Sequence, residues 1–252
     1  PGSPTAASLD SVPRSATPRR SCTREARSDC ASSARSSTSS EDPATSAESE
    51  IGRPRRIGVF GGTFNPPHLG HLLCASAAAD ELGLDEVLIV PTRTPPHKLV
   101  ADEPGPEVRL ALVQAALRDD PRLTASDIEI RREGPSYTVD TLTEIRAVDP
   151  GAEVVLIVGG DMAVSLPTWH RPQEIVRLAA LAVAERGAVD RDAIAESIAS
   201  LGAADVTYFP MIRFDLSSTV VRDRVAAGWP NDYLVPRAVI DEIEARGLYR
   251  LS

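Results

Sequence analysis

From residue 53 onward, the sequence alternates short, β-rich apolar runs with longer stretches of helical periodicity. Such alternation is typical of an α/β fold, because a helix returns the chain to the start of the next parallel strand. The expected strands cover residues 57–60, 86–90, 127–130, 153–158, 181–184 and 206–209. The expected helices cover residues 69–82, 106–117, 139–148, 217–227 and 236–246. We therefore predict a Rossmann-like, doubly wound parallel sheet in a single domain, residues 53–252.

Residues 1–52 have a different composition, rich in Ser, Arg, Ala and Thr and without aromatic residues. Their only large apolar residues are Leu9, Val12 and Ile51, too few to bury the surface that would offset chain entropy. The six Arg and seven acidic residues of this segment nearly balance, so a strong polyanion-binding tail is not expected. We predict a disordered extension without a chemical role.

The chain as a whole is acidic, with 36 Asp and Glu against 27 Lys and Arg and a net charge of −9. This balance argues against a nucleic-acid partner bound through bulk charge, so an anionic ligand must meet a local basic site. No run of about 18 apolar residues occurs, so no membrane partner is expected. Cys22, Cys30 and Cys74 form no CxxC pair, which is typical of a reduced cytoplasmic protein. The sequence leaves open whether the chain forms a homo-oligomer.

The first expected strand runs directly into the segment GGTFNPPHLGH, residues 61–71. Gly61 and Gly62 let the backbone approach a ligand closely, and the following helix start presents unpaired N–H groups. His68 and His71 are three residues apart, so both are expected on one helix face, toward a bound anion. The spacing matches neither a GxGxxG fingerprint nor a P-loop. The segment predicts a phosphate cradle, which also contains Thr63, Phe64 and Gly70.

A metal site is a second interpretation of the same helix start. His68, His71 and Cys74 lie at positions i, i+3 and i+6. A fourth ligand would still be needed, and the apolar flank of this helix suits a packed thiol better. We therefore predict no metal site built from protein ligands.

Two further segments carry basic residues in positions that suit phosphate. Lys98, in the segment PPHK just beyond the second expected strand, is the only lysine of the chain, and a solvated loop charge is its alternative interpretation. Ser217, Ser218 and Thr219 open a later helix, and Arg222 follows one turn on. Hydroxyl, backbone and guanidinium donors at one helix start suit the outer phosphates of a nucleoside triphosphate, whereas the plainer interpretation is a capped helix.

Polar and aromatic groups also follow the buried strand at residues 153–158. Gly159 and Asp161 stand at its end, where open α/β sheets bind ligands, and Asp161 could accept hydrogen bonds from ribose hydroxyls. Trp169 offers an indole face for a flat ring, although it could also be an ordinary core residue. The segment GPSYTVDTL is a turn that feeds a helix, with Thr138 as the expected N-cap.

Taken in order, GGTFNPPHLGH, PPHK, GPSYTVDTL, GGDMAVSLPTWH and LSSTVVR resemble the bacterial nicotinate-mononucleotide adenylyltransferases of the HxGH nucleotidyltransferase superfamily. The resemblance covers residues 55–251, with Asn65 where many relatives have Asp and Leu216 where Ile is usual. It implies transfer of the adenylyl group of ATP to nicotinate mononucleotide, giving deamido-NAD and pyrophosphate. Mg²⁺ is expected as a cofactor, held mainly by oxygens of ATP and water.

The resemblance also implies a division of roles among the site residues. The 5′-phosphate of the mononucleotide would attack the α-phosphorus in line, and this ionised nucleophile needs no general base. His71 and His68 would contact the α- and β-phosphates, and Lys98 and Arg222 the triphosphate, with hydrogen bonds from the hydroxyls of residues 217–219. The implied nicotinate-binding residues are Tyr137, Thr138, Trp169 and His170.

Three alternatives stay open at this point. Pantetheine-phosphate adenylyltransferase shares the HxGH motif and the SST-type motif, and a cytidylyltransferase of the same superfamily would use CTP. A non-catalytic regulator that only binds a nucleotide is an alternative of another class, against which the intact His68, His71, Lys98 and Arg222 speak.

Overall fold

The computed structural model describes residues 53–94, 103–185, 190–202 and 206–250, all within one compact unit, Ser49–Ser252. The extension predicted at residues 1–52 and the basic residue Lys98 lie outside the described residues. The described residues form a six-stranded sheet with the order β3-β2-β1-β4-β5-β6. Every neighbouring pair is parallel, so the predicted Rossmann-like, doubly wound sheet is confirmed.

The strands are β1 (Arg56–Gly62), β2 (Glu86–Pro91), β3 (Leu123–Ala125), β4 (Glu153–Gly159), β5 (Ala180–Glu185) and β6 (Val206–Pro210). β1 pairs with β2 on one side and with β4 on the other. The chain reverses its winding direction between β1 and β4, and ligands of such sheets bind beyond the carboxyl ends of the strands at this switch point.

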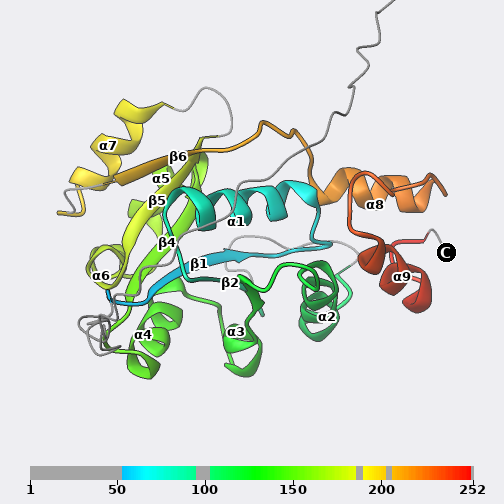
Figure 1. The fold of residues 1–252 in the computed structure, drawn as a ribbon, viewed down its shortest axis with the longest axis horizontal. Helices are drawn as coiled ribbons and strands as arrows, with labels where there is room; N and C mark the ends of the chain where they lie inside the picture. Colours follow the sequence, from blue (N-terminus) through cyan, green and yellow to red (C-terminus); the bar gives the residue numbers. More distant parts are fainter. Residues whose placement is uncertain (1–52, 95–102, 186–189, 203–205, 251–252) are drawn as a thin grey trace, which may run out of the picture. The chain divides into compact units, whose positions relative to one another are not determined.

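The helices are α1 (Leu69–Glu81), α2 (Pro106–Ala116), α3 (Ile128–Arg131), α4 (Thr138–Val148), α5 (Gly160–Ser165), the 3₁₀ turn η1 (Leu166–Thr168), α6 (Pro172–Leu178), α7 (Arg191–Ala199), α8 (Ser218–Ala226) and α9 (Arg237–Arg246). Apolar side chains of α1 and α2 pack on one face of the sheet, and those of α4, α6 and α7 on the other. α8 and α9 lie together beyond the end toward which β1 points (Figure 1).

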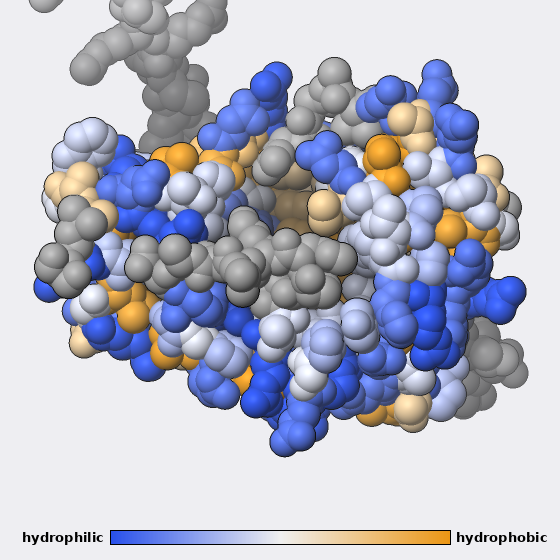
Figure 2. All heavy atoms as spheres, turned by 180° about the vertical axis from the view of Figure 1, so that it is seen from behind, coloured by the Kyte–Doolittle hydropathy of each residue, from blue (hydrophilic) through white to orange (hydrophobic). Residues whose placement is uncertain are grey.

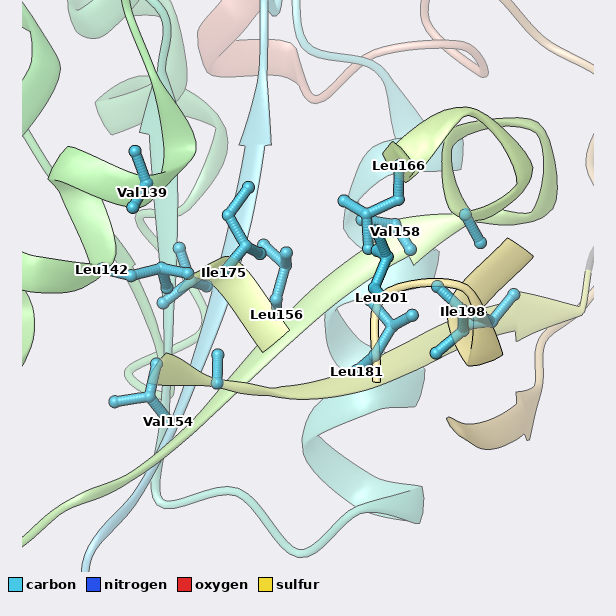
Figure 3. Packing of buried hydrophobic residues seen from close by; sticks show 14 of the residues in the cluster. Val139, Leu142, Val154, Leu156, Val158, Leu166, Ile175, Leu181, Ile198 and Leu201 are labelled. Carbon is cyan, nitrogen blue, oxygen red and sulfur yellow. The ribbon is translucent and has the colours of Figure 1, made fainter. Parts of the chain in front are cut away.

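The alternation of side chains along β4 divides the core in two. Val154, Leu156 and Val158 belong to the cluster shown in Figure 3, where they meet side chains from α4, α6 and α7. Val155 and Ile157 belong to the opposite cluster, which packs against α1. A strand buried on both faces has no polar side, and this explains its continuous apolar sequence.

Two predictions of local structure are wrong. Residues 127–130 were expected as an edge strand, but the edge strand is β3 and this segment forms α3. The apolar–polar alternation at Ile128, Glu129 and Ile130 is misleading, because all three side chains are buried. Thr138 is the first residue of α4 and Tyr137 is its N-cap, so the predicted capping role of Thr138 is also wrong.

Hydrophilic side chains dominate the face drawn in Figure 2, and hydrophobic ones are scattered among them. The same face is hollowed above its centre, where apolar side chains are visible. Within the part of the chain that the structure describes, no helix has the length and apolar character needed to cross a membrane.

Candidate active site

A cavity of about 650 Å³ lies beyond the carboxyl ends of β1 and β4, the place expected from the strand order. Residues from three of the predicted motifs line it together. The first motif supplies Thr63, His68, Gly70 and His71. The end of β4 supplies Gly159 and Asp161, and the last motif supplies Ser217, Ser218, Thr219 and Arg222. Segments about 150 residues apart in sequence thus meet at one cavity of nucleotide size.

The two histidines of the HxGH motif lie face to face at the start of α1. Their ring centroids are 3.7 Å apart and the ring planes differ by 26°, with His68 at the N-cap of α1 and His71 on its first turn. The backbone N–H of His68 donates a hydrogen bond to Nδ1 of His71 at 3.2 Å. A neutral imidazole that accepts at Nδ1 carries its proton on Nε2. His71 is therefore set to donate from Nε2.

Glycine at position 70 is required by the packing of the histidine before it. A Cβ at Gly70 would lie 3.0 Å from Nδ1 of His68, closer than ordinary contacts. Gly62 has a related role, because a Cβ there would lie 2.9 Å from the ring of Phe64. Gly61 has open space where a Cβ would stand. The ring of Phe64 therefore leaves little room for a side chain at Gly62, and none of Gly61, Gly62 and Phe64 lines the cavity.

The start of α8 is bound to the loop that precedes α1. Nη1 of Arg222 donates to the carbonyl oxygen of Asn65 at 2.8 Å, and Nη2 donates to Oγ1 of Thr219 at 3.2 Å. The hydroxyl of Ser218 donates to the carbonyl oxygen of Pro66 at 2.8 Å. Ser217 is the N-cap of α8 and accepts from the N–H of Val220. These contacts fix the guanidinium beside the histidine pair.

Asn65 has a role that the sequence did not indicate. Its side chain is buried, and its Oδ1 accepts a hydrogen bond from the hydroxyl of Tyr249 at 2.6 Å. Burial raises the pKa of Tyr249 above its ordinary value of 10.0, so the phenol keeps its proton at neutral pH. An aspartate could accept the same hydrogen bond, and this accounts for the exchange of Asn and Asp expected at this position.

The predicted nicotinate-binding residues form a second group, outside the residues that line the cavity. The rings of Tyr137 and His170 are stacked, with centroids 4.2 Å apart. Trp169 is half-buried against the core cluster of α4, α6 and α7, and its Nε1 donates to Oγ of Ser165 at 3.4 Å. Thr138 begins α4 directly after Tyr137. Three aromatic side chains therefore lie at the turns that flank α4 and α6.

A buried polar network connects this second group to the end of β2. Oγ of Ser136 accepts hydrogen bonds from the backbone N–H groups of Arg93, at 2.9 Å, and Thr94, at 3.4 Å. Glu129 accepts from Oγ1 of Thr141 at 2.7 Å. Burial raises the pKa of the Glu129 carboxyl, and hydrogen bonds from Thr141 and Ser136 oppose that rise.

Few of the side chains that line the cavity could bind a metal ion. Among the residues that the structure describes, no group of three or more His, Cys, Asp and Glu side chains could hold a metal ion. Cys74 is buried and also lines the cavity. Two carboxylates, Asp161 and Asp190, line it as well. This set fits a divalent cation that brings most of its ligands with it as phosphate oxygens and water.

Comparison with known proteins places the chain in a family. The family model described as cytidylyltransferase-like matches residues 59–224. A probable nicotinate-nucleotide adenylyltransferase of Shouchella clausii is 42% identical over 195 residues, which are 77% of this chain and 97% of that protein. The nicotinate-nucleotide adenylyltransferase of Bacillus subtilis is 36% identical over 195 residues, 77% of this chain and 98% of that protein.

A solved structure shares the fold at lower identity. Plasmodium falciparum nicotinic acid mononucleotide adenylyltransferase, complexed with NaAD, matches with a TM-score of 0.64 and 18% identity, over 77% of this chain and 97% of that one. The solved structure shows only the fold, whereas the sequence relatives show the family. The chain belongs to the nicotinate-nucleotide adenylyltransferase family of cytidylyltransferase-like proteins.

Proposed function

We propose that this enzyme transfers the adenylyl group of ATP to nicotinate mononucleotide, forming deamido-NAD and releasing pyrophosphate. The observation that carries the proposal is the convergence of the histidine pair, the start of α8 and the end of β4 on one cavity of about 650 Å³. The family relationship supplies the identity of the substrates.

The reaction is a direct displacement at the α-phosphorus of ATP. An oxygen of the 5′-phosphate of the mononucleotide forms the new P–O bond, and the bond to the bridging oxygen of the β-phosphate breaks. Pyrophosphate leaves with that electron pair. The nucleophile is already ionised at neutral pH, so this chain needs no general base and acts by positioning and charge stabilisation.

The residues at the cavity take distinct roles in this displacement. His71 donates from Nε2 to an α-phosphate oxygen, where negative charge gathers in the transition state, and His68 contacts the adjacent phosphates. The guanidinium of Arg222 neutralises the outer phosphates, from which pyrophosphate forms. Asp161, which lines the cavity at the end of β4, accepts hydrogen bonds from ribose hydroxyls. Lys98 lies outside the described residues, and its contact with the triphosphate stays a prediction.

Mg²⁺ enters with ATP and offsets phosphate charge when bound. Asp161 and Asp190 are the carboxylates of the cavity that would stand nearest to such a complex. No protein cage is required for this arrangement, because phosphate oxygens and water complete the coordination.

The acceptor ring belongs to the second group of residues. The indole of Trp169 would stack on the pyridine ring, and backbone N–H groups near Tyr137 and His170 would receive its carboxylate. Neutral donors aimed at a carboxylate favour the acid over the uncharged amide.

We propose ATP and nicotinate mononucleotide as the partners of this chain. Three further expectations stay predictions: that the chain has no nucleic-acid partner, that it forms a homo-oligomer, and that it is cytoplasmic.

An assay of donor and product tests the proposed function. The enzyme is incubated with nicotinate mononucleotide, Mg²⁺ and either ATP or CTP, and both products are identified by mass spectrometry. Deamido-NAD and pyrophosphate in equal amounts, formed from ATP, are the expected result. Transfer from CTP in preference to ATP would identify a cytidylyltransferase, and ATP binding without turnover of any acceptor would identify a non-catalytic regulator.

A further inference from the structure

Arg109 of α2 is a charged side chain with no exposure to solvent, and it is the largest of the fully buried side chains. A guanidinium enclosed in this way is costly unless its donors are matched by acceptors. Nothing in the proposed chemistry uses Arg109, and it does not line the cavity. Its burial therefore needs another explanation.

The partners of Arg109 are backbone carbonyl oxygens at the ends of two strands. Nη1 donates to the carbonyl oxygen of Thr63 at 2.9 Å. Nη2 donates to that of Thr92 at 2.6 Å and to that of Arg93 at 3.2 Å. Nε donates to the carboxylate of Glu103. All three nitrogens of the fork are occupied, so the guanidinium is matched in geometry and in charge.

These carbonyls belong to the two chain segments that leave β1 and β2 on the side of the cavity. Thr63 follows β1 and lines the cavity, and Thr92 follows β2. One further hydrogen bond joins the segments directly, from the N–H of Thr92 to the carbonyl oxygen of Gly62 at 2.9 Å. Arg109 spans the same junction from the side of α2, so it sets where Thr63 lies relative to the end of β2.

We propose that Arg109 is a positioning residue for ATP, which holds the wall of the cavity at Thr63 in register with the end of β2. This inference rests on the proposed function, because it assigns the cavity to ATP. Arg109 touches no substrate. A shorter or uncharged side chain would leave two or three of these carbonyls without the donors that Arg109 supplies, and the segments after β1 and β2 would shift apart.

Two variants of Arg109 test the proposal. Arg109→Met keeps most of the side-chain volume and removes every donor, and Arg109→Lys keeps the charge but lacks the fork. Steady-state kinetics and the melting temperature are measured for each, with assays run well below the melting temperature. We expect KM for ATP to rise at least about tenfold in Arg109→Met and by less in Arg109→Lys. KM for the mononucleotide should change less than about threefold.

Arg122→Met is the matched control. Arg122 also makes several hydrogen bonds, to Asp80, Asp120 and Ser76, but none of these residues lines the cavity. Loss of these contacts should lower the melting temperature and leave both KM values unchanged. An equal rise in KM for ATP in Arg122→Met would mean that general destabilisation explains the effect, and the proposal would fail.

The affinity for ATP, measured by calorimetry without acceptor, separates this inference from the proposed function. An inactive wild-type enzyme would overturn the proposed function alone, and weaker ATP binding by the Arg109 variants would still support the positioning role. Unchanged affinity and unchanged KM for ATP in folded Arg109→Lys would overturn the positioning role. The lysine variant carries the test should the methionine variant fail to fold, because it retains the buried charge.

Discussion

Nδ1 of His71 accepts a hydrogen bond from the backbone N–H of His68 at 3.2 Å. This contact uses one ring nitrogen to fix the start of α1 and leaves the proton of the neutral ring on Nε2. The spacing HxGH thus has a physical reason: the first histidine is the N-cap of α1, and the second, on the first turn, accepts a hydrogen bond from its backbone N–H. The hydrogen bond fixes the orientation of the His71 ring, and a donor with a fixed orientation suits the proposed charge stabilisation.

His71→Asn separates the two functions of this imidazole. The amide oxygen of asparagine can still accept from the His68 N–H, but the Nε2 donor is lost. We expect kcat to fall at least about 10²-fold, because removal of one donor to a developing charge typically costs that much. His71→Gln, whose amide nitrogen reaches further, should retain more activity. Wild-type turnover by His71→Asn, measured by pyrophosphate release, would contradict the assigned role.

Arg222→Met removes the guanidinium that is proposed to bind the outer phosphates of ATP. Hydrogen bonds to charged groups contribute about 1.5–3 kcal/mol, so KM for ATP should rise roughly 10- to 150-fold. Arg224→Met is the control on the same helix, because that side chain contacts Pro230 and Trp229 instead. Equal KM values for the two variants would argue against the contact of Arg222 with ATP.

Trp169→Ala tests the proposed stacking on the pyridine ring. Stacking on an aromatic side chain is worth about 1–3 kcal/mol, so KM for the mononucleotide should rise roughly 5- to 150-fold while KM for ATP stays constant. The variant should also melt at a lower temperature, since Trp169 packs on the core. Trp229, which is 60% exposed, supplies the control Trp229→Ala. A change in stability alone would leave Trp169 as a core residue only.

The buried carboxyl of Glu129 predicts a pH dependence of stability. Burial raises its pKa, so the folded chain holds this proton at pH values where the unfolded chain, with a pKa near 4.5, has released it. The stability that this bound proton adds is fully present at pH values below the pKa of Glu129 in the unfolded chain. It is lost as the pH rises through the pKa of Glu129 in the folded chain.

Glu129→Gln removes the titratable carboxyl group and keeps the volume of the side chain. Urea denaturation of both proteins from pH 4.5 to 8 should show that the wild-type free energy of unfolding falls relative to the variant as the pH increases, then levels off. A difference that is constant, or that grows in favour of the wild type with increasing pH, would show that the carboxyl is not desolvated as described.

Periodicity predicted five of the six parallel strands and the crossover helices α1, α2 and α4, because each of these elements leaves a local signal. The first helix, expected over residues 69–82, is observed as Leu69–Glu81. α3 was missed because its short apolar–polar alternation mimics a strand, and only the tertiary contact of Glu129 with Thr141 explains the burial of a carboxylate there. α6 and α7 were not predicted at all.

The contacts that support the site were harder to predict than its motifs. Tyr249 and Asn65 are 184 positions apart, and no local pattern indicates their hydrogen bond. Arg109 stands in a helix with an apolar face, where an arginine would ordinarily be assigned to the solvent side. Its carbonyl partners carry no side-chain signature, so the sequence could not reveal them.

The acceptor specificity of the enzyme tests the central claim most directly. Values of kcat/KM are measured with ATP and Mg²⁺ for nicotinate mononucleotide, nicotinamide mononucleotide and phosphopantetheine under the same conditions. We expect nicotinate mononucleotide to have the highest kcat/KM, with a lower value for the amide and no turnover of phosphopantetheine. A higher value for phosphopantetheine than for either pyridine mononucleotide would contradict it.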